Sequence, residues 1–153
     1  MKIYFIILIL PILFSACAHK SAFDDFNITK KQELSEEQLQ NAKIQDTNET
    51  TGLLTALYLN NVDKKEFHDD EYFYISLYVQ NSTGKNLEFL LNSKKPLIVE
   101  KLSNPNKFTD LTSINAVWRQ YYLVVFTKEK GELKLQVKDN NSSSRVLLFK
   151  QEE

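Results

Sequence analysis

Two patterns of hydrophobic and polar residues divide this chain. Up to residue 50, apolar residues are either gathered in one block at the N-terminus or sparse, whereas from residue 51 onward they recur in short runs between turn-forming residues. Short apolar or alternating runs bounded by Asn, Gly and Pro are typical of β-strands. The pattern predicts strands at 53–60, 72–81, 87–91, 97–102, 117–127, 132–138 and 145–150.

The clearest strand covers residues 72–81, where two kinds of side chain alternate. Phe73, Ile75, Leu77 and Val79 form the set that we expect to face a core, and Tyr72, Tyr74 and Tyr78 belong to the outward set. Tyrosine combines a large contact area with a polar tip, so this stripe is a candidate binding face. The alternative, which we favour, is that the rings pack across strands or lie under the 18–50 segment.

About seven short strands with regular turns predict an all-β fold, namely an immunoglobulin-like antiparallel β-sandwich over residues 51–153. Trp118, in the apolar run at 117–127, is expected to be buried in its core. The chain has a single cysteine, so no disulfide can join the two sheets of the sandwich.

The apolar block at the N-terminus has the layout of an export signal. Lys2 precedes an apolar stretch from Ile3 to Phe14, which is too short to span a bilayer. Phe14-Ser15-Ala16-Cys17 resembles the lipobox of bacterial lipoproteins, although Leu is usual at its first position. The alternatives are a plain signal peptide with a chance cysteine and an uncleaved anchor.

The lipobox resemblance implies that residues 1–16 are removed and that Cys17 becomes the lipidated N-terminus, with palmitate-like chains anchoring the protein in a membrane. Two or three acyl chains anchor a protein stably, because each buried methylene contributes about 0.8 kcal/mol. Ala18 follows Cys17, where Asp would signal retention in the inner membrane in many lipoproteins. We therefore expect the outer membrane.

Residues 17–50 are polar and are expected to form the lipidated N-terminus and a tether. The alternative is a short helix, since Ser35 with Gln38, or Thr29 with Gln32, has the spacing of a capping box. The apolar stripe of such a helix is thin, which favours the flexible tether.

Composition narrows the function classes. The net charge of −1 gives no basic face for nucleic acid. His68-Asp69-Asp70-Glu71 contains metal-binding residue types but lacks the spacing of a calcium loop, so we expect a solvated acidic loop and no metal site. With Cys17 acylated and no nucleophile motif present, we expect neither an enzyme nor a cofactor.

Three segments read Asp-x-Asn-x-Ser/Thr, and their central asparagines are Asn27, Asn48 and Asn141. The pattern resembles the extended sequon of periplasmic N-glycosylation in epsilon-class proteobacteria. All three sites fall in the predicted tether or in turns, where an acceptor asparagine is exposed. The alternative is coincidence, because polar loops are rich in these residue types.

The lipobox, the composition rich in Lys, Asn and Ile, and the strand order together resemble small immunoglobulin-like lipoproteins of epsilon-class proteobacteria, several of which are related to adhesion. The resemblance carries no site residues. It leads us to expect an outer-membrane lipoprotein whose β domain binds a protein or glycan partner, for example a surface adhesin. The alternative is a periplasm-facing accessory lipoprotein for envelope assembly.

Overall fold

In the computed structural model, residues 29–47, 49–80 and 86–152 are described, and they form nine antiparallel strands. The strands are β1 (Leu39–Asp46), β2 (Glu49–Tyr58), β3 (Glu71–Val79), β4 (Leu87–Leu91), β5 (Ile98–Leu102), β6 (Gln120–Phe126), β7 (Leu133–Asp139), β8 (Ser142–Ser144) and β9 (Leu147–Phe149). The helices are α2 (Lys30–Gln38), α3 (Leu59–Val62) and the short 3₁₀ turn η2 (Thr109–Leu111). The predicted all-β antiparallel fold is confirmed.

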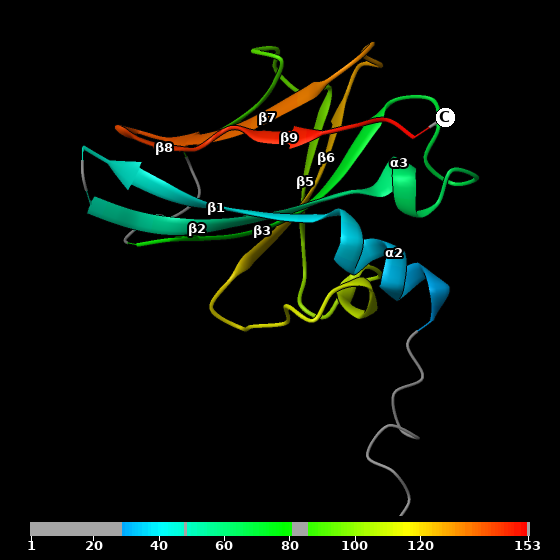
Figure 1. Ribbon diagram of the computed structural model, residues 1–153. Coiled ribbons are helices and arrows are strands. Elements are labelled where there is room, and N and C mark those ends of the chain that lie inside the picture. The colour runs from blue at the N-terminus through cyan, green and yellow to red at the C-terminus, as the bar shows by residue number, and fades with distance from the viewer. Residues whose placement is uncertain (1–28, 48, 81–85, 153) are drawn as a thin grey trace, which may run out of the picture.

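The strands pair in the order β4-β7-β8-β1-β2-β3-β6-β5, and β9 pairs with β7. The sheet curls, so that β7 and β9 lie over β1, β2 and β3 (Figure 1). The short strand β8 pairs with both β7 and β1, and it therefore carries the sheet from one layer to the other. Because of this continuity, the two separate sheets of an immunoglobulin-like sandwich are not confirmed.

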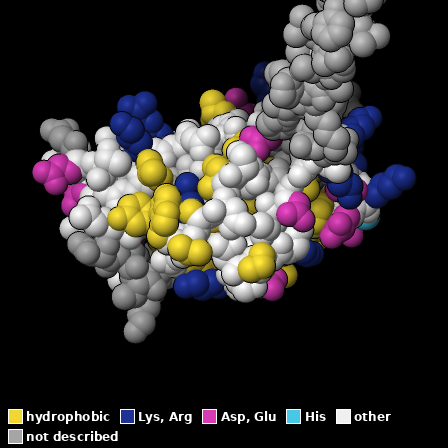
Figure 2. Space-filling model, turned by 90° about the horizontal axis from the view of Figure 1, so that it is seen from below, with side chains coloured by type: hydrophobic (Ala, Val, Ile, Leu, Met, Phe, Trp, Pro, Cys, Tyr) yellow, Lys and Arg dark blue, Asp and Glu magenta, His cyan; other side chains and the backbone are white. Residues whose placement is uncertain are grey.

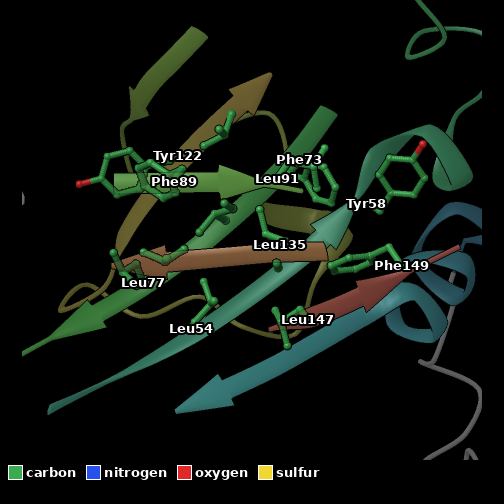
Figure 3. Close-up of a cluster of buried hydrophobic side chains, with 14 of the residues drawn as sticks. Leu54, Tyr58, Phe73, Leu77, Phe89, Leu91, Tyr122, Leu135, Leu147 and Phe149 are labelled. Carbon is green, nitrogen blue, oxygen red and sulfur yellow. The ribbon is translucent and has the colours of Figure 1, made fainter. Parts of the chain in front are cut away.

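The main hydrophobic core fills the inside of the curl. Phe73, Ile75 and Leu77 of β3 belong to it, as the alternation predicts. Figure 3 shows Phe73 and Leu77 in this core together with Leu135 and Phe149 from the opposite layer. The ring centres of Phe73 and Phe149 lie 5.3 Å apart in an edge-to-face arrangement, which aromatic pairs prefer. This core holds the two layers of the sheet together.

A second, smaller core covers part of the outer face of the sheet. Tyr74, on the opposite side of β3 from the main core, is buried there; its ring stacks on Tyr121 at 6.0 Å and meets Phe108 at 5.2 Å. Phe108 belongs to the segment between β5 and β6 that crosses this face. The outward tyrosine stripe is therefore interrupted at Tyr74, which is buried because the β5–β6 segment crosses the sheet there.

The predicted domain boundary at residue 51 is wrong, because α2 and β1 belong to the fold. The alternative start of a helix at Thr29 is present as a capping box, with Thr29 and Gln32 bonding reciprocally across the first turn. β1 pairs along its length with β2, and Ile44 enters the main core. The sparse apolar residues of this part of the chain favoured a tether, but α2 and β1 are held mainly by backbone hydrogen bonds and less by hydrophobic side chains.

Candidate interaction surface

The predicted site residues lie in different environments. Cys17, Asn27 and Asn48 are outside the described residues, and nothing further is said of them. Asn141 is exposed at the turn between β7 and β8, which is the accessibility that a glycosylation acceptor needs. Its use as an acceptor stays a prediction.

The three tyrosines do not form one exposed face. Tyr74 is buried, as described above, and Tyr72 is half-buried with its ring 5.2 Å from that of Phe67. Tyr78 alone remains open to solvent, with 37% of its surface exposed. The predicted binding face is therefore corrected to its Tyr78 end, because the β5–β6 segment covers Tyr74 and Phe67, in the connection between α3 and β3, packs on Tyr72.

Trp118 is exposed rather than buried, which corrects the expectation that it belongs to the core. It precedes β6, which begins only at Gln120, and 57% of its surface is open. Its ring stands edge-on to that of Tyr78 at 5.3 Å. Val117 beside it is 93% exposed. Large apolar side chains gathered in the open mark interaction sites more often than isolated ones do.

These residues form a continuous surface with Leu53 of β2, which lies directly opposite Tyr78 across the β2–β3 pair and is also exposed. We call Leu53, Tyr78, Val117, Trp118 and Arg119 the Trp118 surface. Seen from below, hydrophobic side chains gather on this side of the molecule, the side on which α2 and the β5–β6 segment lie (Figures 1 and 2).

The turn that carries Val117 and Trp118 is held at both ends. The backbone of Ala116 donates to the Tyr121 hydroxyl at 2.8 Å, and that hydroxyl donates back to the Ala116 carbonyl at 3.1 Å. Arg119 N–H also donates to the Ala116 carbonyl at 3.1 Å. Farther back, Ser113 N–H donates to a carboxylate oxygen of Glu36 in α2. A preorganised turn loses less entropy on binding than a mobile one.

Arg119 anchors the surface to a row of polar side chains across the sheet. Asn41, Thr55 and Ser76 occupy successive positions on β1, β2 and β3. Arg119 Nη2 donates to Thr55 Oγ1 at 3.0 Å and to the Ser76 carbonyl at 3.1 Å, and Thr55 donates to Asn41 Oδ1 at 2.6 Å. Burial lowers the pKa of the Arg119 guanidinium from its usual high value. The group stays charged at neutral pH.

Sequence reasoning did not single out Arg119. The one available signal was a charged residue inside the apolar run 117–127, between Trp118 and Tyr121. An interruption of that kind marks a turn or a polar site as readily as a strand, so the spacing alone could not decide between them.

A second group of ionisable side chains surrounds Glu71, which is fully buried and so departs from the expected solvated acidic loop. Its carboxylate accepts hydrogen bonds from the Tyr58 hydroxyl at 2.5 Å, from Glu129 N–H at 3.0 Å and from Gln151 Nε2 at 2.7 Å. Lys128 Nζ lies 3.8 Å away. Burial, with the neighbouring carboxylate, raises the pKa of Tyr58 above its usual value. Every carboxylate oxygen has a partner, which is typical of a structural network.

Two further features bear on function. In the described part of the chain, no three His, Cys, Asp or Glu side chains are grouped so that they could hold a metal ion. No helix among the same residues is both long enough and apolar enough to cross a bilayer.

The geometry thus leaves the Trp118 surface as the strongest candidate site among the described residues. Comparison of the chain with models of protein families, with curated proteins and with solved structures finds no match in any of the three.

Proposed function

We propose that the chain is a lipid-anchored protein of the outer membrane, attached through Cys17, whose β domain binds a protein or glycan partner with the Trp118 surface. The observation that carries the proposal is the exposed pair Tyr78 and Trp118 on a hydrogen-bonded turn. Trp, Tyr and Arg are the residue types that dominate the binding energy of protein interfaces.

The ordered helix α2 limits how far the domain can stand from its anchor. Since Thr29 caps α2, the chain from Cys17 to Thr29 could span at most about 40 Å even when fully extended. This is a much shorter tether than residues 17–50 would make. A domain held so close to a bilayer is suited to a partner that lies at the membrane surface.

The anchor is tested by feeding cells an alkyne-bearing fatty acid and comparing the wild type with the Cys17→Ser variant. We expect label on the wild-type protein only, and the variant to leave the membrane fraction. Equal labelling of both proteins, or none in the wild type, would contradict attachment through Cys17. Protease digestion of intact and lysed cells then decides on which side of the membrane the domain lies.

The binding surface is tested by a photo-crosslinking residue placed at position 117 in the native host. Because Val117 is 93% exposed, the replacement should not disturb the fold. We expect a discrete adduct whose digestion by protease or glycosidase identifies the partner class. A crosslinker at Lys134, on β7 in the other layer of the sheet, serves as the control position.

The adduct at position 117 should disappear when Trp118→Ala is added. Leu148→Ala is the matched control, since Leu148 is also a half-exposed apolar residue but lies on β9. An adduct that survives Trp118→Ala, or one that forms equally well from position 134, would refute binding through this surface.

A further inference from the structure

The Trp118 surface contains a cation, Arg119, that has no counter-ion among the described residues. Arg119 is half-buried, yet no carboxylate among the described residues forms an ion pair with it. The groups that Arg119 contacts are neutral: it donates to Thr55 Oγ1 and to the Ser76 carbonyl, and its guanidinium carbon lies 5.6 Å from the centre of the Trp118 ring. A buried charge is normally paired, because removing a charge from water costs several kcal/mol.

Two polar atoms at this site, one on Arg119 itself and one on Ser76, also lack hydrogen-bond partners among the described residues. Arg119 Nε and Ser76 Oγ are buried and make no hydrogen bond within the described structure, and Ser76 as a whole is only 3% exposed. Most buried polar groups in proteins are hydrogen-bonded, so an unsatisfied cluster calls for an explanation. Both atoms are occluded from solvent, so they mark a polar site that is incompletely satisfied, and the part of Arg119 that lines the cavity is the part an external group could reach.

A cavity of about 300 Å³ opens next to the guanidinium. Its wall combines Arg119, Lys43, Asn41 and Thr55 with the apolar residues Leu53 and Ile114. Leu53 also belongs to the Trp118 surface, so the cavity and that surface are continuous. The cavity therefore offers positive charge at one point and apolar contact around it.

We propose that this cavity receives the carboxylate of an Asp or Glu side chain from a partner protein, with an apolar neighbour of that residue packing against Leu53 and Ile114. The inference rests on the proposed function and specifies its partner. An acidic sugar would supply the same charge. Its hydroxyls, however, would need several further polar partners, and besides the two cations the wall offers only Asn41 and Thr55, whose side chains already bond each other.

The chain offers a sharp spectroscopic test because it contains only two arginines, Arg119 and the exposed Arg145. The Nε–H signals of both can be followed by NMR in the unacylated mature chain, residues 17–153 with Cys17→Ser. The probes are the capped tripeptide acetyl-Leu-Glu-Leu-amide and its neutral counterpart acetyl-Leu-Gln-Leu-amide. Glucuronate and glucose form the second pair of probes.

We expect the Glu peptide to shift the Arg119 signal saturably while the Arg145 signal stays in place. The Gln peptide should bind about tenfold or more weakly, because a charge-assisted hydrogen bond is lost. The Arg119→Gln variant lacks this signal, so binding to it is followed through the backbone amide signals of Leu53 and Ile114, after the rest of the amide spectrum is shown to be unchanged; the two peptides should bind it alike. Lys43→Gln should weaken the response less than Arg119→Gln does, since Lys43 lies at the cavity without bonding the polar row.

Three results would overturn the inference. Glucuronate that saturates the Arg119 shift at lower concentration than the Glu peptide would assign the cavity to an acidic glycan. If no probe shifts the Arg119 signal, Arg119 does not bind a carboxylate. A change of the Arg119 signal in an Asp24→Asn/Asp25→Asn variant, together with no response to peptide, would assign the cavity to the chain's own N-terminal segment.

The outcome is separable from that of the proposed function. An adduct at position 117 that is lost in Trp118→Ala but kept in Arg119→Gln would leave partner binding in place and reject the carboxylate. An adduct kept in both variants would reject the proposed function itself.

Discussion

Two charged groups in this protein are withdrawn from water, and their surroundings differ. Glu71 is fully buried and accepts hydrogen bonds from Tyr58, Glu129 and Gln151. Within the described part of the chain, Arg119 is half-buried, donates only to neutral oxygens beside the Trp118 ring and keeps an unsatisfied Nε. A complete set of partners makes the first group part of the scaffold, whereas the incomplete set at the second is what a binding site needs before its ligand arrives.

The difference also reflects where each group lies in the fold. Glu71 starts β3 and ties the β6–β7 connection and the C-terminal segment to it, since Gln151 bonds both Glu71 and the Glu129 carbonyl. Arg119 precedes β6 at the edge of the second core, where the covering segment ends and the sheet face becomes exposed. Substitutions at the two positions should therefore differ in size and in kind.

The largest effect is expected for Glu71→Ala. Removal of the carboxylate leaves the Tyr58 hydroxyl, Glu129 N–H and Gln151 amide without their buried acceptor, at a cost of about 3–5 kcal/mol in the free energy of unfolding. Chemical denaturation measures it. The exposed neighbour Asp69→Asn should change stability by less than about 0.5 kcal/mol. Similar losses in both variants would show that the network is not structural.

The next effect is expected for Gly52→Ala, beneath the Trp118 surface. A Cβ at Gly52 would lie 2.3 Å from the Tyr78 carbonyl oxygen and 3.1 Å from Val79 Cα, so the β2–β3 pair must shift. We expect a loss of about 1–3 kcal/mol, measured by thermal unfolding.

The matched control for Gly52 is Gly131→Ala. Gly131 has a positive φ of 84° and open space where a Cβ would be, so its substitution acts through backbone conformation and not through contact. Gly131→Ala should leave the NMR signals of Tyr78 and Trp118 in place, whereas Gly52→Ala should move them. Unchanged signals in Gly52→Ala would contradict the close approach.

Arg119→Met sharpens the comparison because its effect on stability should be small. The variant loses two hydrogen bonds but also removes a half-buried charge that has no ion-pair partner in the described part of the chain, so the unfolding free energy should stay within about 1 kcal/mol of the wild type. Denaturant unfolding and the peptide titration are measured on the same sample. A loss as large as that of Glu71→Ala would make Arg119 a structural residue.

The smallest effect concerns the ion pair that docks α2. Lys31 Nζ lies 2.5 Å from Asp63 Oδ2, and this contact lowers the pKa of the Asp63 carboxyl below its usual value. The stabilisation is present above the unfolded pKa of about 4 and is lost as the pH falls through the folded value. The melting temperature of Asp63→Asn should therefore fall less than that of the wild type on acidification.

Lys31→Met provides the check on this pH dependence, since it removes the other partner of the pair. Like Asp63→Asn, it should make the melting temperature fall less steeply as the pH is lowered. A wild-type slope in Lys31→Met would assign the pH dependence to other carboxylates.

The sequence predicted much of the sheet because its signal is local. Alternation along residues 72–81 places Phe73, Ile75 and Leu77 in the core, and the strand expected at 87–91 has the bounds of β4. A period of two and a turn cluster are visible within ten residues. β1 and β8 escaped prediction because they carry few apolar residues and lie in polar segments, so that backbone pairing, of β1 with β2 and of β8 with β7 and β1, is their main support.

The candidate site shows the same division. Sequence alone determined that Tyr78 belongs to the outward set of its strand, and it marked Cys17 as the candidate anchor. Only the tertiary structure decided that Tyr74 is covered, that Trp118 is exposed beside Tyr78, and that Arg119 has no counter-ion among the described residues. Alternation says which side of a strand a residue faces, but burial and charge pairing depend on which distant segment crosses that side, and that is settled by packing.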